Sequence, residues 1–139
     1  MTFCVDTSAV IPLLLPLPSS EAVRPFWADA LEDAGPLLAP PLLFAETTSV
    51  LRRYVHLGGV LHEEAEAALG SFLRLPISVV HTPEVYLRAL GLARRLGHAK
   101  AYDVQYLAVA QIQDCPVVTA DRGLHESART LGIASRLIA

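Results

Sequence analysis

The stretch Phe3-Cys4-Val5-Asp6-Thr7-Ser8 opens with three apolar residues and then presents a carboxylate followed by two hydroxyl residues. A buried strand that delivers an acid to the carboxyl edge of an α/β sheet has this form. Asp-Thr-Ser is also a good helix N-cap sequence. The stretch therefore predicts a first strand followed by a helix, and a functional role for Asp6 depends on partners elsewhere in the chain.

Short apolar runs alternate with helical segments along the rest of the chain. Strands are predicted at 37–39, 77–80, 116–119 and 133–138. Helices are predicted at 19–33, 42–57, 62–73, 83–96, 102–113 and 122–131, and Pro25 makes the first of these bend or start late. A short helix after Asp6, capped by Thr7 or Ser8, precedes them. This alternation predicts a mostly parallel sheet with helices on both faces, as one domain over residues 1–139.

Composition narrows the class of protein. The chain has 53% hydrophobic residues, which excludes disorder, and a net charge of −3, which argues against general electrostatic binding of nucleic acid but allows a local basic surface. Val10–Leu17 is too short and too proline-rich to span a bilayer, and no basic segment precedes an apolar one. We expect a cytoplasmic protein without a membrane partner. Its two cysteines, Cys4 and Cys115, should be buried, reduced thiols.

One acid falls on the apolar face of a predicted helix. At 100° per residue, Glu46 lies in the middle of a stripe formed by Leu42, Leu43, Val50, Tyr54 and Leu57. Burying a carboxylate there without a partner would cost several kcal/mol, on the order of the penalty for an isolated buried charge. Arg53 on the same stripe is an alternative partner, although its spacing from Glu46 exceeds the favoured helical pair spacings.

Two further acids have comparable positions. Asp103 shares a face of its helix with Tyr106, Leu107 and Ala110, although an acid in a first helical turn is also favoured by the helix dipole. Asp121 follows an apolar strand and precedes a helix, as Asp6 does, and could likewise be an N-cap. If the four acids converge, they require a cation to remain ionised together. Oxygen ligands without histidine or cysteine favour Mg²⁺ or Mn²⁺, which suits attack of water on a phosphodiester.

With these acids the chain resembles the PIN-domain nucleases, most closely the toxins of VapBC-type toxin–antitoxin pairs. The resemblance rests on 5–11, on Phe44-Ala45-Glu46 with Val50-Leu51, on 101–110 and on 118–124. It implies an α/β fold of PIN type: a three-layer α/β/α sandwich with a mostly parallel five-stranded sheet. It also implies a Mg²⁺- or Mn²⁺-dependent endoribonuclease that forms a homodimer and is silenced by an antitoxin protein over the cleft.

The resemblance also implies roles for individual residues. The catalytic acids would be Asp6, Glu46, Asp103 and Asp121, of which Asp6, Asp103 and Asp121 would be metal ligands. Thr7 and Thr119 match the hydroxyl residues beside the strand-end acids. Basic residues near the acids would contact RNA phosphates. They are Arg94, Arg95, Lys100 and Arg122. The alternative is that these four residues are ordinary solvated surface charges.

Two other functions are compatible with the sequence. Asp6 at the end of the first strand would suit an aspartyl phosphotransfer domain, but Ser8 stands where such a phosphatase needs a second acid. A PIN-like module that binds RNA or protein without catalysis is the other alternative, and the complete set of four acids argues against it.

Overall fold

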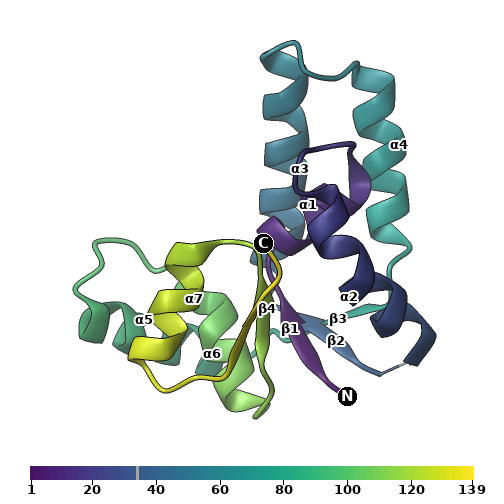
Figure 1. Cartoon of the computed structure of the whole chain (residues 1–139). Helices are drawn as coiled ribbons and strands as arrows, with labels where there is room; N and C mark the ends of the chain where they lie inside the picture. Colours follow the sequence, from purple (N-terminus) through teal and green to yellow (C-terminus); the bar gives the residue numbers. More distant parts are fainter. Residues whose placement is uncertain (34) are drawn as a thin grey trace.

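The computed structural model of the chain describes residues 1–33 and 35–139. Its sheet has five three-residue strands: β1 (Phe3–Val5), β2 (Leu37–Ala39), β3 (Ile77–Val79), β4 (Val117–Thr119) and β5 (Ser135–Leu137). All neighbouring strands are parallel, and their order across the sheet is β3-β2-β1-β4-β5 (Figure 1). The predicted parallel five-stranded sheet is therefore confirmed, although β5 is shorter than the predicted strand at 133–138.

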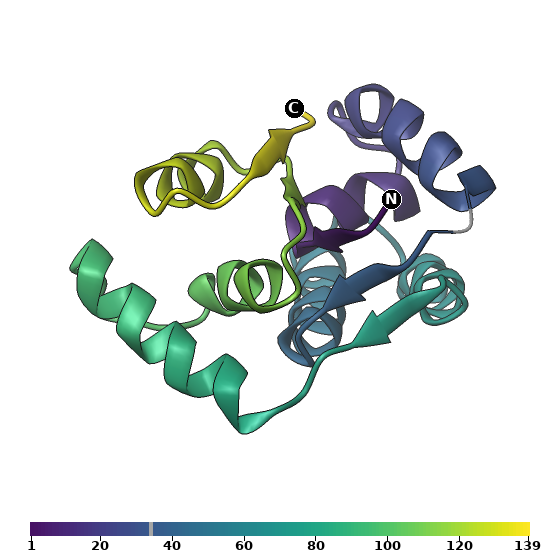
Figure 2. The same ribbon diagram turned by 90° about the horizontal axis from the view of Figure 1, so that it is seen from below.

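The helices cover both faces of this sheet. They are α1 (Thr7–Leu14), α2 (Ser20–Asp33), α3 (Leu42–His56), α4 (His62–Leu73), α5 (Pro83–Leu96), α6 (Val104–Ile112) and α7 (Arg122–Thr130). Figure 2 shows α1 to α4 on one side of the strands and α5 to α7 on the other, as right-handed crossovers in both directions from β1 require. The three-layer sandwich is confirmed. No helix in the described part of the chain is both long and apolar enough to cross a membrane.

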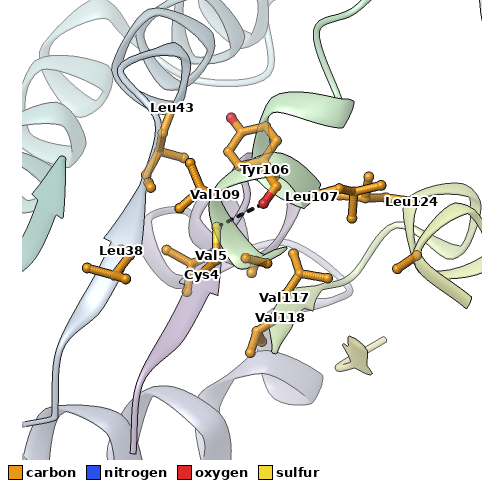
Figure 3. Close-up of a cluster of buried hydrophobic side chains, with 14 of the residues drawn as sticks. Cys4, Val5, Leu38, Leu43, Tyr106, Leu107, Val109, Val117, Val118 and Leu124 are labelled. Carbon is orange, nitrogen blue, oxygen red and sulfur yellow. Dashed lines mark hydrogen bonds between the residues drawn. The ribbon is translucent and has the colours of Figure 1, made fainter. Parts of the chain in front are cut away.

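The main core is one cluster of buried side chains that fills both faces of the sheet, with α1 and α2 on one face and α6 on the other (Figure 2). Cys4 and Val5 of the central strand and Leu107 of α6 are completely buried. The Cys4 thiol donates a hydrogen bond to the backbone carbonyl of Tyr106 at 3.4 Å, while the Tyr106 ring points away from Cys4 (Figure 3). Both cysteines are free and buried, as predicted. The first strand and α6 are thus locked together directly beneath the acids that they carry.

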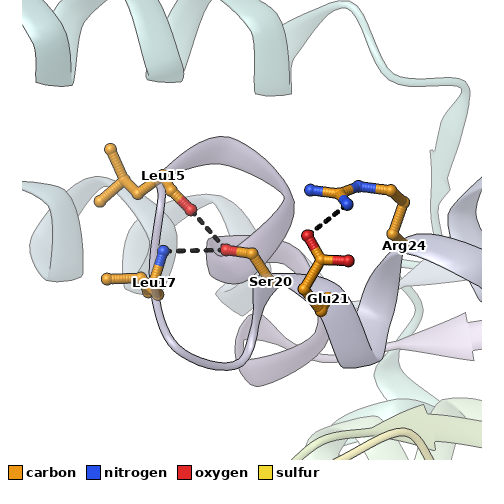
Figure 4. A network of polar contacts seen from close by, with 5 residues as sticks. All are labelled: Leu15, Leu17, Ser20, Glu21 and Arg24. Atoms are coloured by element: carbon orange, nitrogen blue, oxygen red, sulfur yellow. Dashed lines mark hydrogen bonds and ion pairs between the residues drawn. The ribbon is translucent and has the colours of Figure 1, made fainter.

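The connection from α1 to α2 is a tight turn closed by one serine. The Ser20 hydroxyl accepts from the Leu17 backbone N–H at 2.9 Å and donates to the Leu15 carbonyl at 2.8 Å (Figure 4). Helix α2 begins at Ser20 and continues through Pro25, so the predicted alternative of a late start is wrong. The exposed Glu21–Arg24 pair beside the turn adds little stability, as is usual for surface ion pairs.

Helices α3 and α4 form an antiparallel pair that extends beyond the carboxyl ends of the strands (Figure 1). A second, smaller apolar cluster holds this pair against α1, and it consists of Ile11, Leu15, Leu51, Ala65 and Ala68. Because α1 and α3 are fixed to each other there, the first turns of both helices keep a constant position at the carboxyl edge of the sheet.

Candidate active site

Asp6 lies at the point where the central strand ends and α1 begins. It is the N-cap residue of α1, and its Oδ1 accepts from the Ala9 backbone N–H at 3.2 Å. The Ser8 hydroxyl donates to the carboxylate at 2.8 Å from Oδ1, and the Thr119 hydroxyl donates to Oδ2 at 3.0 Å. The prediction that Thr7 or Ser8 caps this helix is wrong, because both already belong to its first turn and only Asp6 has the extended backbone of a cap.

The Asp6 carboxylate is held by neutral donors. Asp6 is only 6% exposed, and this burial is the main reason why the pKa of its carboxyl group rises from 3.8 to about 7. Hydrogen bonds from Ser8, Thr119 and Ala9 lower the pKa, and the charge of Asp121 raises it further. No ion pair among the described residues involves Asp6. The ionised form is therefore costly unless a cation enters the site.

Glu46 belongs to a second group of hydrogen bonds that joins α3, α1 and α6. The Tyr106 hydroxyl donates a hydrogen bond to Glu46 Oε1, and the Thr7 hydroxyl donates to the same oxygen at 3.1 Å. Tyr106 is only 2% exposed, and burial together with Glu46 raises the pKa of its phenol, so it stays protonated and donates. The alternative pairing with Arg53 is wrong, since these two hydroxyls are the partners of Glu46 in the described structure.

The stripe predicted around Glu46 is correct only near the start of α3. Leu43 is completely buried and Val50 and Tyr54 are partly buried, but Leu57 lies just after the helix and is 72% exposed. The C-terminal part of α3 extends beyond the strands and packs on α4 and α1 (Figure 1), but Leu57 at its end belongs to neither apolar cluster of the described residues. Glu46 itself is partly buried and faces the cleft.

Asp103 and Asp121 each directly precede a helix. The predicted start of the first of these helices at residue 102 is wrong: α6 begins at Val104, and Asp103 is its N-cap residue without a capping hydrogen bond. Asp103 is exposed, but the loss of water where its carboxylate faces the cleft raises its pKa. The charge of Asp121 raises this pKa further, and His98 lowers it. Asp121 does cap α7, accepting from the backbone N–H groups of Gly123 at 2.7 Å and Leu124 at 3.2 Å.

All four acids line one cleft of about 350 Å³ at the carboxyl edge of the sheet. Thr7, Ser8 and Tyr106 line the same cleft, and its other wall is apolar and aromatic, formed by Ile11, Pro12, Leu17, Val50 and Tyr54. The acids surround an open space: within residues 1–33 and 35–139, no three acidic, histidine or cysteine side chains gather tightly enough to enclose a metal ion. Proteins commonly bind Mg²⁺ through one or two carboxylates, with waters and substrate phosphates as the other ligands. The oxygen donors and the buried Asp6 carboxylate fit such an ion.

Two residues of the cleft were not singled out by the sequence. The sequence pattern places Tyr106 on the apolar stripe of its helix and Ser8 at a helix cap. The available signal was that a buried tyrosine needs a partner for its hydroxyl, and Tyr106 lies one turn after Asp103. Of the basic residues, Arg94 and Arg95 are exposed on the last turn of α5, and Arg122 is exposed beside Asp121. Lys100 is exposed in the segment between α5 and α6.

The fold and the cleft define the class of protein. The neighbouring strands β1 and β4 are followed by helices on opposite faces of the sheet, α1 and α7, so the switch point lies between these two strands (Figure 2). The acids lie outside the carboxyl ends of the strands at this point, where open α/β sheets bind their ligands. The sequence model of the PIN-domain family matches residues 3–129, and the chain therefore belongs to this family.

Several solved structures share the fold along nearly the whole chain. PAE2754 from Pyrobaculum aerophilum is 25% identical with a TM-score of 0.70, over 97% of this chain and 92% of that one. VapC20 from Mycobacterium tuberculosis, a sarcin–ricin loop cleaving toxin, is 20% identical with a TM-score of 0.69, over 90% and 94%. VapBC2 from Rickettsia felis, solved with a promoter DNA fragment, is 11% identical with a TM-score of 0.74, over 100% of both chains. No curated protein sequence matches the chain.

Proposed function

We propose that this chain is a metal-dependent endoribonuclease and the toxin of a toxin–antitoxin pair. The observation that carries the proposal is the convergence of Asp6, Glu46, Asp103 and Asp121, which come from four separate parts of the chain, on one cleft at the switch point of a PIN fold. The solved structures that share the fold include a toxin that cleaves the sarcin–ricin loop, an RNA target.

Asp6, Asp103 and Asp121 are the proposed ligands of Mg²⁺ or Mn²⁺. They lie at the end of β1, before α6 and after β4, so the sheet and α6 fix their spacing. A bound divalent ion would neutralise charge on the scissile phosphate and lower the pKa of water. The Ser8 and Thr119 hydroxyls orient the Asp6 carboxylate, since both donate to it.

Glu46 has a different proposed role. Its Oε1 is fixed by the Tyr106 and Thr7 hydroxyls, whereas Oε2 accepts no hydrogen bond from the described residues. Oε2 is therefore available to accept a proton from a water molecule that approaches the phosphate, in the manner of a general base. The raised pKa of the Tyr106 phenol keeps its proton in place, so that Tyr106 positions Glu46 and does not exchange protons with it.

The same comparison supports a protein partner. VapBC complexes from Rickettsia felis and nontypeable Haemophilus influenzae, and FitAcB from Neisseria gonorrhoeae, share the fold. We accordingly propose that a cognate antitoxin covers the cleft, that the chain forms a homodimer, and that it acts on RNA in the cytoplasm.

The test is RNA cleavage by the purified chain with Mn²⁺ or Mg²⁺, with and without EDTA. Asp6→Asn and Asp103→Asn should each abolish cleavage while circular dichroism shows an unchanged fold. Asp29→Asn removes the same charge from an exposed position on α2 and should cleave normally. Cleavage that persists in EDTA and in both site variants would refute the proposal. RNA binding without any cleavage would favour the non-catalytic module, and phosphate trapped on Asp6 would favour phosphotransfer.

A further inference from the structure

A second hollow adjoins the acidic cleft on the side of the segment between α5 and α6. Its volume is about 560 Å³, and it is lined by Gly97, His98, Ala99, Lys100 and Tyr102 together with Glu46 and Asp103. Glu46 and Asp103 also line the acidic cleft, so the two spaces share a wall. Gly97 ends α5 with φ 70°, a left-handed conformation, and directs the chain toward Asp103. In Figure 1 this segment is the loop at the left of the picture that leads from α5 to α6.

Tyr102 exposes an aromatic side chain directly beside Asp103. It is 57% exposed, and within the described structure it makes no side-chain hydrogen bond and no ring contact. The other exposed tyrosine, Tyr86, packs edge-on against His81. Burial of Tyr102 in the core therefore does not explain its presence, and its ring is free to stack on a planar group.

The same segment also offers positive charge. Lys100 is exposed and forms no ion pair with any described residue, and His98 lines the same hollow. The opposite wall of the acidic cleft, at Leu17, Val50 and Tyr54, is apolar and aromatic. Because the chain is negative overall, a polyanion next to the four acids needs a local cation, and this side of the cleft provides one.

We propose that residues 97–103 form a substrate-positioning subsite for unpaired RNA, in which the base next to the cut phosphate stacks on Tyr102. Lys100 and His98 contact the backbone phosphate of that nucleotide. This inference rests on the proposed ribonuclease function and adds to it a contact for the base next to the cut phosphate. A base within a duplex keeps both faces covered by its neighbours, so only an unpaired nucleotide can place its base on the tyrosine.

Binding in EDTA measures this subsite without cleavage. A labelled single-stranded RNA of about ten nucleotides should bind Tyr102→Ala about 5- to 150-fold more weakly than the unchanged chain, the range expected for one stacked base. Tyr102→Trp should restore binding, because it also presents an aromatic face. Tyr86→Ala is the matched control and should bind normally. An RNA duplex of the same length should bind at least about tenfold more weakly than the single strand.

Abasic substitution distinguishes stacking from a structural role. A set of RNAs, each lacking one base, should contain a position at which the unchanged chain loses about as much affinity as Tyr102→Ala does. At that position the variant should lose nothing more, since the two changes remove the same contact. Equal losses for both proteins at every position would overturn the inference, as would a Tyr102→Ala variant with unchanged affinity and KM.

The two proposals fail differently. If the unchanged chain neither binds nor cuts RNA, the proposed function fails, and the subsite fails with it. If the unchanged chain cuts RNA with Mn²⁺ and Tyr102→Ala cuts it with the same KM, only the subsite is refuted. If Tyr102→Ala keeps its affinity for RNA but loses binding of a protein partner, the surface belongs to that partner and the subsite is refuted.

Discussion

Replacement of Asp6 by asparagine should make the chain more stable when divalent metal is absent and the pH is above 7. Asp6 is almost completely buried, and its ionised form receives only neutral hydrogen bonds. Asparagine fills the same volume without the charge. Its carbonyl can accept from Ala9 and Ser8, and its amide can donate to the Thr119 hydroxyl.

The size of the effect follows from the pKa of Asp6. In the folded chain this pKa is about 7, against an ordinary value of 3.8, so folding favours the protonated acid. This contribution is fully present below about pH 4 and is lost as the pH rises through 7. A pKa difference of roughly three units corresponds to about 4 kcal/mol of unfolding free energy. About 2 to 3 kcal/mol of this stability is lost between pH 5 and pH 8. Rearranged hydrogen bonds in the variant cost about 1 kcal/mol at every pH.

Urea unfolding in EDTA at pH 5, 6.5 and 8 measures this directly. The unfolding free energy of Asp6→Asn minus that of the unchanged chain should increase by about 2 to 3 kcal/mol from pH 5 to pH 8. Asp29→Asn should show no such trend, because it removes an exposed charge. Added Mn²⁺ should stabilise the unchanged chain and not Asp6→Asn. A pH-independent difference, or a variant that is less stable at pH 8, would refute the reasoning.

Three other variants test the contacts around the cleft and the core. Tyr106→Phe removes the hydroxyl that fixes Glu46. It should lower kcat about tenfold, which corresponds to a hydrogen bond of 1 to 2 kcal/mol, and leave KM unchanged. A rise in KM of about tenfold would contradict a positioning role. Ser8→Ala should lower the unfolding free energy by about 1 to 3 kcal/mol, measured in urea, because it removes one donor to the buried Asp6 carboxylate and the acceptor of the partly buried Ala120 backbone N–H. Trp27→Phe loses the 2.8 Å bond to the Ala9 carbonyl and should lower the melting temperature; an unchanged melting temperature would show that this bond contributes little.

The fold was predictable because its information is local. Apolar runs such as 3–5 and 117–119 are bounded by polar or turn residues, and each became a buried strand. The alternation of these runs with helical segments then leaves parallel pairing as the consistent arrangement. The ends of elements were less accurate, since the start of α6 depends on the segment that leads from Gly97 and not on helix propensity.

The candidate site was predictable only in part. The four acids stand out because carboxylates at strand ends and on apolar helix faces conflict with burial. Their partners do not stand out, because a tyrosine on an apolar stripe and a serine after an N-cap are normal in any core or helix. The link from Tyr106 to Glu46 spans sixty positions in sequence and arises only when α3 and α6 meet above the sheet. Helical periodicity gives the face of a residue but not its partner on another element.

The four acids form no ion pair with any described residue, and this is the physical reason to expect a metal among them. The ion pairs of the described structure lie at exposed positions, and none includes Asp6, Glu46, Asp103 or Asp121. A protein that used these acids only for structure would gain stability by placing an arginine or lysine among them, because an opposite charge lowers the pKa of a buried carboxyl. Here the neighbours are hydroxyl groups and backbone N–H groups, which orient carboxylates without neutralising them. That arrangement leaves the negative charge available to a divalent ion, at a cost in stability that Asp6→Asn should reveal.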